Sequence, residues 1–161
     1  MMNSMRTLLL TAFVSLAIVG CTKHDDFTNE LFDCECGTMQ VNGRDLNVRM
    51  AEGFNPDSTD SNLWRYHLVA DFRHEEEAIN HAPSEDLSIT VDLIYSGSSF
   101  TANATDVLTA NYIAIPVDEM WDVTSGTVEI NAGDSLHTLT LNDVAVDGDK
   151  TLNGEFTIIP H

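Results

Sequence analysis

Three oxygen-bearing side chains near the end of the chain form a candidate site for a hard cation. Asp147, Asp149 and Asn153 follow one another within a single short segment. Calcium prefers clustered carboxylate and amide oxygens, so this segment is the sharpest metal candidate in the sequence. An EF-hand loop would place glycine and glutamate where Leu152 and Ile158 stand, so that motif fails. Ordinary turn chemistry explains the same residues, and both interpretations stay open.

Catalytic motifs give no positive indication of an enzyme. The chain contains no Gly-x-Ser-x-Gly, no His-Glu-x-x-His, no phosphate-binding loop and no dinucleotide fingerprint. Carboxylates are abundant, yet no pair is singled out for general acid and base work. We therefore expect a protein that is not an enzyme. The competing hypothesis is a carboxylate-based or calcium-dependent hydrolase at the cell surface.

Aromatic side chains offer a third kind of chemistry, because their faces can stack on sugar rings. The candidates are Trp64, Tyr66, Tyr95, Tyr112 and Trp121. Strand alternation puts Trp64, Tyr66 and Tyr95 on core-facing positions, which favours packing over ligand binding. Trp121 is left open between the two roles.

Two cysteines are separated by one residue, Cys34 and Cys36. In an exported protein such a pair can form a local disulfide, and this is the interpretation we favour. Two free thiols and half of a metal site are the alternatives. Zinc is the weakest of the three, because no further Cys or His cluster lies nearby to complete a site.

Charge excludes one class of partner. The 161 residues include 26 acidic and 7 basic side chains, a formal net charge of -19. Such a chain lacks the Lys and Arg needed to displace counterions from nucleic acid, so we expect no nucleic-acid partner. No Lys or Arg occurs from His74 to Asp149. Two explanations of this uneven charge distribution stay open. The acids could form a face that attracts cations, or they could keep the protein soluble while some of them pair with Arg across strands.

Alternation of period two dominates the folded part and must position these residues. Asn42-Gly43 joins two alternating segments, the strongest short indication of a hairpin. Glu75 to Asn80 is the single helical candidate, and Gly154 is expected in a bulge. Strands are predicted over residues 38–41, 44–50, 63–73, 87–95, 111–117, 120–123, 127–130, 136–141 and 152–159.

The predicted fold is all-β. Between seven and nine short antiparallel strands favour a β-sandwich, with a partly closed β-barrel as the alternative. On the strand at 63–73, Tyr66, Leu68, Ala70 and Phe72 are expected to face the core, whereas Asp71 and its polar neighbours face solvent. Residues 38–161 then form one domain, a size that supports its own core.

The N-terminal residues 1–20 read as a cleaved signal peptide. A positively charged residue precedes an apolar run that is too short to cross a bilayer as a helix. Residues 21–37 are polar and acidic and read as a flexible tether.

Ile18-Val19-Gly20-Cys21 resembles the lipobox of bacterial lipoproteins. The resemblance implies cleavage between Gly20 and Cys21, with a diacylglyceryl group on the Cys21 thiol and a further acyl chain such as palmitate on the new amino group. Two or three acyl chains hold a protein at a bilayer far more firmly than one. The chain is therefore expected to be exported and lipid-anchored in the bacterial cell envelope, at the outer membrane, with surface exposure open. The anchor would be its sole membrane contact.

Three further resemblances point to the Bacteroidota. Lys23-His24-Asp25-Asp26 is similar to the export signal of their surface lipoproteins, and Ser58 and Ser135 resemble acceptors of their O-glycans. The segments at 39–46, 125–130 and 152–158 look like those of small all-β lipoproteins of uncharacterised function. These matches imply a fold and no activity. The functional expectation is an anchored binding or assembly module for a protein or glycan partner, without a cofactor other than the calcium considered above.

Overall fold

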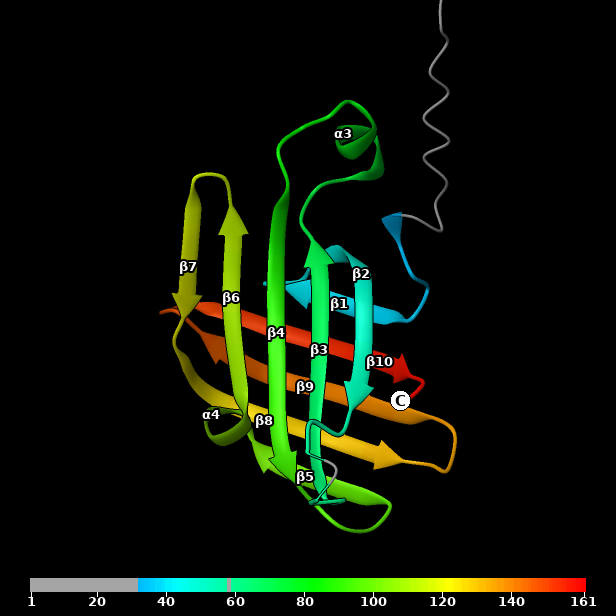
Figure 1. Cartoon of the computed structure of the whole chain (residues 1–161). Helices are drawn as coiled ribbons and strands as arrows, with labels where there is room; N and C mark the ends of the chain where they lie inside the picture. Colours follow the sequence, from blue (N-terminus) through cyan, green and yellow to red (C-terminus); the bar gives the residue numbers. More distant parts are fainter. Residues whose placement is uncertain (1–31, 58) are drawn as a thin grey trace, which may run out of the picture.

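The computed structural model describes residues 32–57 and 59–161, so the predicted signal peptide, Cys21 and Ser58 lie outside the described residues. The described chain is all-β and antiparallel, as predicted (Figure 1). Its strands are β1 (Gly37–Val41), β2 (Arg44–Phe54), β3 (Leu63–Asp71), β4 (Glu85–Ile94), β5 (Ser99–Asn103), β6 (Leu108–Ala114), β7 (Val117–Trp121), β8 (Val123–Ala132), β9 (His137–Val146) and β10 (Lys150–Ile158). Two short helices, α3 (Glu75–Ile79) and α4 (Ala104–Val107), complete the described elements.

All ten strands belong to one sheet in the order β5-β8-β9-β10-β1-β2-β3-β4-β6-β7. The sheet folds over itself at β2, which pairs with β1 through its first residues and with β3 through the remainder. A register shift between Val48 and Met50 marks this bend. The strands of the two halves run across each other (Figure 1). The result combines features of the predicted sandwich and of a partly open barrel.

The turn chemistry expected from the sequence is confirmed at two positions. Asn42 and Gly43 both have positive φ, 52° and 76°, as a two-residue hairpin turn between β1 and β2 requires. The register of β10 against β9 shifts between Leu152 and Gly154, where a bulge was expected. Both features fix which side chains of β1 and β10 face the core.

The core lies between the two halves of the sheet. On β4 and just after it, every predicted core position is buried: Leu87, Ile89, Val91, Leu93 and Tyr95. On β3 and just after it, Tyr66, Leu68, Ala70 and Phe72 are buried as well, and Trp64 packs against the core from a half-buried position. The expectation for Asp71 is wrong, because this carboxylate is 0% exposed and is covered by two arginines.

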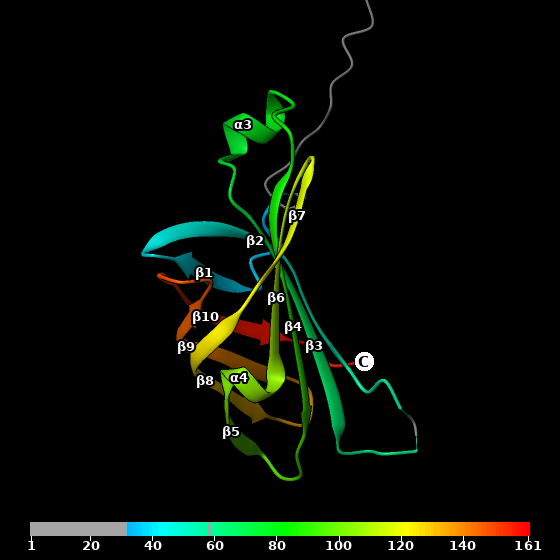
Figure 2. The same ribbon diagram turned by 90° about the vertical axis from the view of Figure 1, so that its left-hand side faces the viewer.

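Two elements escaped the sequence analysis, namely β5 and α4. β5 alternates polar and apolar residues over only five positions, with Phe100 as its one large apolar side chain, so its pattern is too short to stand out. α4 lies low in the molecule beside β5 and β8, whereas α3 stands above the sheet at the opposite end (Figure 2). The strand predicted at 111–117 actually ends at Ala114, because Pro116 occupies the two-residue turn before β7.

The end of the predicted tether is bound to the domain. Phe32 is buried, and the Arg49 guanidinium lies 5.6 Å from its ring centroid. The Cys34 N–H donates to the Val48 carbonyl, and the Cys36 carbonyl accepts from Thr157 N–H. Cys34 and Cys36 are joined by a disulfide. Within residues 32–57 and 59–161, no helix has the length and apolar character needed to cross a membrane.

Candidate binding site beside an open sheet edge

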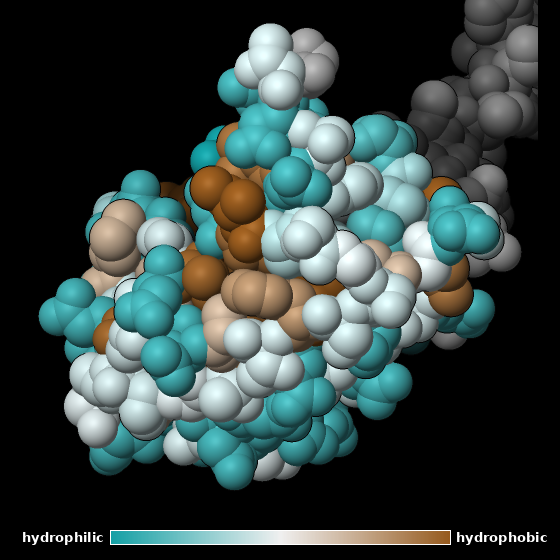
Figure 3. All heavy atoms as spheres, turned by 90° about the horizontal axis from the view of Figure 1, so that it is seen from below, coloured by the Kyte–Doolittle hydropathy of each residue, from teal (hydrophilic) through white to brown (hydrophobic). Residues whose placement is uncertain are grey.

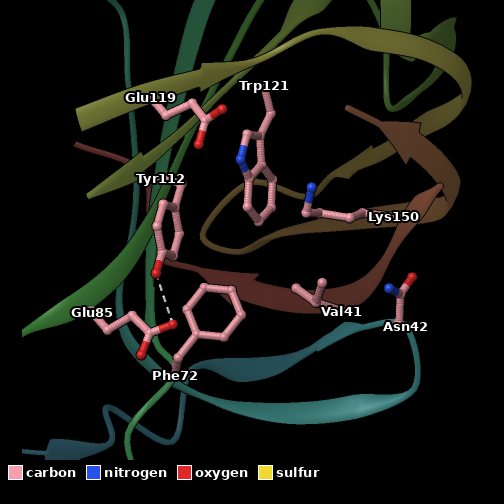
Figure 4. A pocket seen from close by; sticks show the side chains of 8 residues that line it. All are labelled: Val41, Asn42, Phe72, Glu85, Tyr112, Glu119, Trp121 and Lys150. Atoms are coloured by element: carbon pink, nitrogen blue, oxygen red, sulfur yellow. Dashed lines mark hydrogen bonds between the residues drawn. The ribbon is translucent and has the colours of Figure 1, made fainter. Parts of the chain in front are cut away.

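A pocket of about 270 Å³ opens where the two halves of the sheet meet beside β7. It is assembled from the β1–β2 turn, the adjacent ends of β3 and β4, the β6–β7 hairpin and the start of β10. Its lining residues are Val41, Asn42, Phe72, Glu85, Tyr112, Glu119, Trp121 and Lys150 (Figure 4). Three aromatic rings and two carboxylates thus surround one hollow.

The aromatic rings are packed against one another in a fixed arrangement. Tyr112 and Trp121 are stacked with centroids 5.4 Å apart and planes inclined by 7°. Phe72 meets Tyr112 edge-on at 5.6 Å and Trp121 at 6.5 Å. Trp121, left open by the sequence, is 5% exposed. This stack supports the β6–β7 hairpin from its inner face.

A cation of the chain itself lies on this aromatic stack. The Lys150 Nζ is 4.9 Å from the Trp121 ring centroid, on the side of the ring away from Tyr112 (Figure 4). The same ammonium pairs with Asp147 at 2.8 Å. Its hydrogen bond with Asp147 raises the pKa of Lys150, as do the charges of Asp149 and Glu119. The site therefore favours positive charge.

Carboxylates outnumber cations around the pocket. The Tyr112 hydroxyl donates to Glu85 Oε1 at 2.9 Å. Burial first, then this hydrogen bond and the charges of Glu85 and Glu119, raise the pKa of Tyr112. Within the described part of the chain, neither Glu85 nor Glu119 has a cationic partner within ion-pair distance. Their negative charge is therefore left uncompensated by a direct contact.

The β7 strand forms an exposed edge next to this pocket. In the sheet of described residues it pairs with β6 on one side, and no strand lies on its other side. Four of its five residues are exposed. Large apolar side chains project from this hairpin, with Ile115 80% and Met120 67% exposed, alongside Ile113 and Val117. Exposed apolar groups on an unpaired edge are a common feature of docking surfaces.

A second cluster surrounds Asp71, at the end of β3. Arg73 Nη2 lies 2.6 Å and Arg49 Nη1 3.0 Å from Asp71 Oδ2, and the Arg73 N–H donates to Oδ1. Burial alone would raise the pKa of Asp71, but these hydrogen bonds and charges hold it below its ordinary value. Arg73 also donates to the Ala82 carbonyl. The cluster therefore ties the α3 loop to β2 and β3.

Asp86 faces Asp71 across the β3–β4 pairing. One oxygen of Asp86 accepts from the Ser84 hydroxyl, and Oδ1 is buried without a partner. Burial, with the charge of Asp71, raises the pKa of Asp86. The two carboxylates thus have pKa values moved apart, as a hydrolytic pair requires. Asp71, however, is fully buried and holds two arginines, so one carboxyl at most could reach a substrate.

Tyr66 and His137 form a buried polar network between the layers. The Tyr66 hydroxyl is hydrogen-bonded to Tyr95 at 2.9 Å and to His137 Nδ1 at 2.8 Å, and Trp64 packs on the imidazole. Burial lowers the pKa of His137, which favours the neutral ring. The hydroxyl groups of Tyr66 and Tyr95 and the Nδ1 atom of His137 are thus each hydrogen-bonded within the protein. The network therefore contributes to the core.

Two of the three sequence-predicted calcium ligands interact with other residues of the protein. Asp147 pairs with Lys150, and Asn153 Oδ1 accepts from the Asp143 N–H. Asp149 is exposed. Within the described ranges, no group of three or more His, Cys, Asp or Glu side chains could hold a metal ion. Ser135 is exposed in the turn between β8 and β9, so it is accessible.

The lower face of the molecule carries a further apolar region (Figure 3). A hollow of about 280 Å³ is lined there by Asn62, Ile94, Tyr95, Ser96 and Phe100. Ile94 is 64% exposed, and Tyr95 stacks on Phe100 at 5.8 Å. No charged side chain lines this hollow, which separates it chemically from the pocket beside β7.

No protein-family model, no curated protein and no solved structure matches the chain. Its function must therefore be argued from the site itself. Sequence reasoning singled out Tyr112 and Trp121 as aromatic candidates but missed Phe72, Glu85 and Lys150 as their neighbours. The long stretch without Lys or Arg was the one available indication, because it leaves the carboxylates of the β6–β7 hairpin without cations nearby in the sequence.

Proposed function

We propose that this chain is a lipid-anchored protein of the bacterial cell envelope whose folded domain binds a protein partner at the β7 edge. The anchor is the acylated Cys21 of the lipobox-like segment, and residues 22–31 link it to the domain. The protein acts by binding rather than by catalysis. The compartment rests on the sequence resemblance, and the binding face rests on the structure.

The observation that carries the binding role is the unpaired β7 edge beside a hollow rich in aromatic and acidic side chains. An unpaired edge offers backbone N–H and C=O groups to an added strand, and alternate side chains supply specificity. Ile115 and Met120 add apolar contact area at the same place. These features are those of a surface that receives an extended polypeptide.

A protein partner fits this site better than a glycan. Sugar binding needs an uncovered aromatic face, but Trp121 has Tyr112 on one side and Lys150 on the other. The Arg44 guanidinium lies 5.8 Å from the Phe72 ring centroid, so that ring is covered as well. The exposed backbone of β7 has no counterpart in carbohydrate recognition, whereas it suits β-strand addition.

The anchor is tested by metabolic labelling with a palmitate analogue and fractionation of cells that express the full-length chain or Cys21→Ala. We expect label and membrane association for the unchanged chain, and loss of both for the variant. Cys34→Ala serves as the matched control and keeps its label. A Cys21→Ala chain that remains in the membrane fraction after a high-salt wash would contradict the anchor.

The binding face is tested in the same cells with a photo-crosslinking residue at Met120 or, as control, at Thr101 in β5. We expect a discrete adduct from position 120, with a partner peptide in its mass spectrum, and none from position 101. A saccharide mass in the adduct would overturn the choice of a protein partner. Adducts of equal yield from both positions would overturn the assignment of the face.

A further inference from the structure

We infer that the partner segment at β7 is extended and cationic, pairing with the outer edge of β7 and presenting a Lys or Arg side chain to Glu119. This inference deepens the proposed function and rests on it. Three features of the described residues carry it: the backbone geometry of β7, the two acids on it that have no direct ion-pair partner, and the internal ammonium that already lies on Trp121.

The backbone of β7 is arranged for strand addition. The two-residue turn joins Ala114 to Val117, and these two residues form the first hydrogen-bonded pair of the β6–β7 hairpin. Along β7, hydrogen-bonded pairs then alternate with pairs that are not hydrogen-bonded. The amides of Asp118 and Met120 then point away from β6, toward the open side. A segment laid along this edge receives at least two backbone hydrogen-bonding positions without any change in the sheet.

The side chains of β7 determine the charge of the segment. Asp118 and Glu119 are exposed on the strand. β4 to β9 contain no Lys or Arg, and among the described residues neither acid has a cation within ion-pair distance, although the charge of Glu119 acts on Lys150. Asn111 donates to Asp118, which orients that carboxylate without neutralising it. Opposite charges on facing positions of neighbouring strands attract each other, so Lys or Arg is favoured on the added segment.

A second copy of the same chain is a poor occupant of this edge. An antiparallel pairing of β7 with β7 that is centred on Asp118 or on Glu119 would place that acid against the same acid of the other copy. Like charges directly opposite each other destabilise a strand pair. The acids therefore discourage self-association while they admit a cationic segment, which gives the edge its selectivity.

The inner face of β7 adds a place for one cationic side chain. Glu119 and Trp121 lie on this face and line the pocket (Figure 4). A side chain opposite Glu119 on the added strand projects to the same face. Lys150 shows that an ammonium group can lie against Trp121. The carboxylates of Glu85 and Glu119, which line the same pocket, provide negative charge for a second ammonium group.

The test uses the purified full-length protein and two synthetic peptides, with binding measured by calorimetry. The first peptide is acetyl-Lys-Thr-Val-Lys-Val-Thr-Lys-amide, and the second carries Gln in place of each Lys. We expect the Lys peptide to bind about 10-fold more tightly than the Gln peptide, a preference that shrinks at high salt because exposed pairs are screened.

Two variants separate the charge from the edge. Glu119→Gln is expected to weaken the Lys peptide about 3-fold, the size of one exposed ion pair, and the matched Glu129→Gln on β8 leaves affinity unchanged. Met120→Pro removes an outward N–H and is expected to weaken both peptides about 10-fold. Circular dichroism checks that each variant keeps the sheet, and Met120→Lys is the replacement if the proline variant does not fold.

The outcomes distinguish this inference from the proposed function. Equal affinity for the two peptides overturns the cationic segment, and the proposed function still stands if the photo-adduct forms at Met120. Full affinity in an edge variant that keeps its sheet overturns the edge, and with it the proposed binding face. Concentration-dependent dimerisation that Met120→Lys abolishes overturns the choice of partner in favour of a second copy.

Discussion

The two edges of this sheet are built from different chemistry. β5 has no charged residue, and the chain passes directly from it into α4, whose Ala104 is fully buried. α4 contacts β8, β5 and β4, so a helix lies beside the end of β5. β7 carries two acids and an exposed methionine, is backed by the aromatic stack, and adjoins a pocket.

This difference indicates how one sheet can protect one edge and use the other. Both edge strands have five residues, but a strand that continues directly into a helix offers less continuous backbone to a partner. A charged, aromatic-backed strand excludes its own copies by like-charge repulsion and retains complementarity for an oppositely charged segment. The predictions below begin with the largest expected effect.

The largest difference between the edges is expected from removal of the aromatic that lies behind each. Trp121→Ala deletes a buried ring and is expected to cost about 4 kcal/mol in the free energy of unfolding. Phe100→Ala at β5 removes a half-buried ring and is expected to cost about 2 kcal/mol. Urea denaturation of both variants measures the two values. Phe100 also packs against the core, so equal losses would contradict the view that β7 is supported more strongly from the core than β5.

A variant that lies on neither edge tests whether the edges share one scaffold. Asp71→Asn leaves Arg49 and Arg73 without their carboxylate and is expected to cost about 3 kcal/mol. Hydrogen exchange should then rise at β5 and at β7 together. A rise at one edge alone would show that the sheet does not unfold as a unit.

The pH dependence of this cluster follows from the lowered pKa of Asp71. Its ion pairs stabilise the fold fully above the ordinary value of 3.8, and this contribution is lost as the pH falls from there through the lowered folded value. The stability of Asp71→Asn should lack this part of the acid-induced loss. Denaturation midpoints of both proteins across this pH window provide the measurement, and parallel acid profiles would contradict the assignment.

Removal of the internal cation sharpens the contrast in charge. Lys150→Met keeps an apolar chain near Trp121 but deletes the ammonium, so the pocket should bind the Lys peptide about 3-fold more tightly, the size of one exposed pair. Calorimetry measures this change, and Lys23→Met, far along the chain from the pocket, is the control. Weaker binding in Lys150→Met would show that Lys150 contacts the partner instead of competing with it.

The smallest effect on stability is expected at the exposed edge itself. Met120→Lys on β7 and Thr101→Lys on β5 should each change the free energy of unfolding by less than about 0.5 kcal/mol. Their effects on the Lys peptide should differ, because only the β7 variant places a like charge beside the segment. Equal affinities for the two variants would remove the functional distinction between the edges.

Much of the scaffold could be predicted from local pattern. The Asn42-Gly43 turn and the alternation of Leu87, Ile89 and Val91 depend on short-range geometry, which a sequence displays directly. β5 was missed because its alternation extends over only five residues, of which Phe100 is the one large apolar side chain. Asp71 was assigned to solvent because the alternation of residues along a strand shows which face of the sheet a side chain is on. The alternation does not show that Arg49 and Arg73 cover Asp71 on that face.

The candidate site was less predictable than the fold for the same reason. Its pocket combines Val41 with Tyr112 and Lys150, which lie far apart in sequence and meet only because the sheet folds over itself at β2. The role of the edge depends on strand order, which neighbouring residues do not encode. The acidic character of the edge could be predicted from the sequence, because the stretch without Lys or Arg from His74 to Asp149 contains β7.

The most direct test of the account is amide chemical-shift mapping of the Lys peptide on the isotope-labelled full-length protein. The account predicts shifts concentrated at residues 117–121, with the indole signal of Trp121 among them, and no shifts at residues 99–103. Shifts centred on residues 99–103, or spread evenly over both edges, would contradict the claim that the β7 edge is the docking edge of this protein.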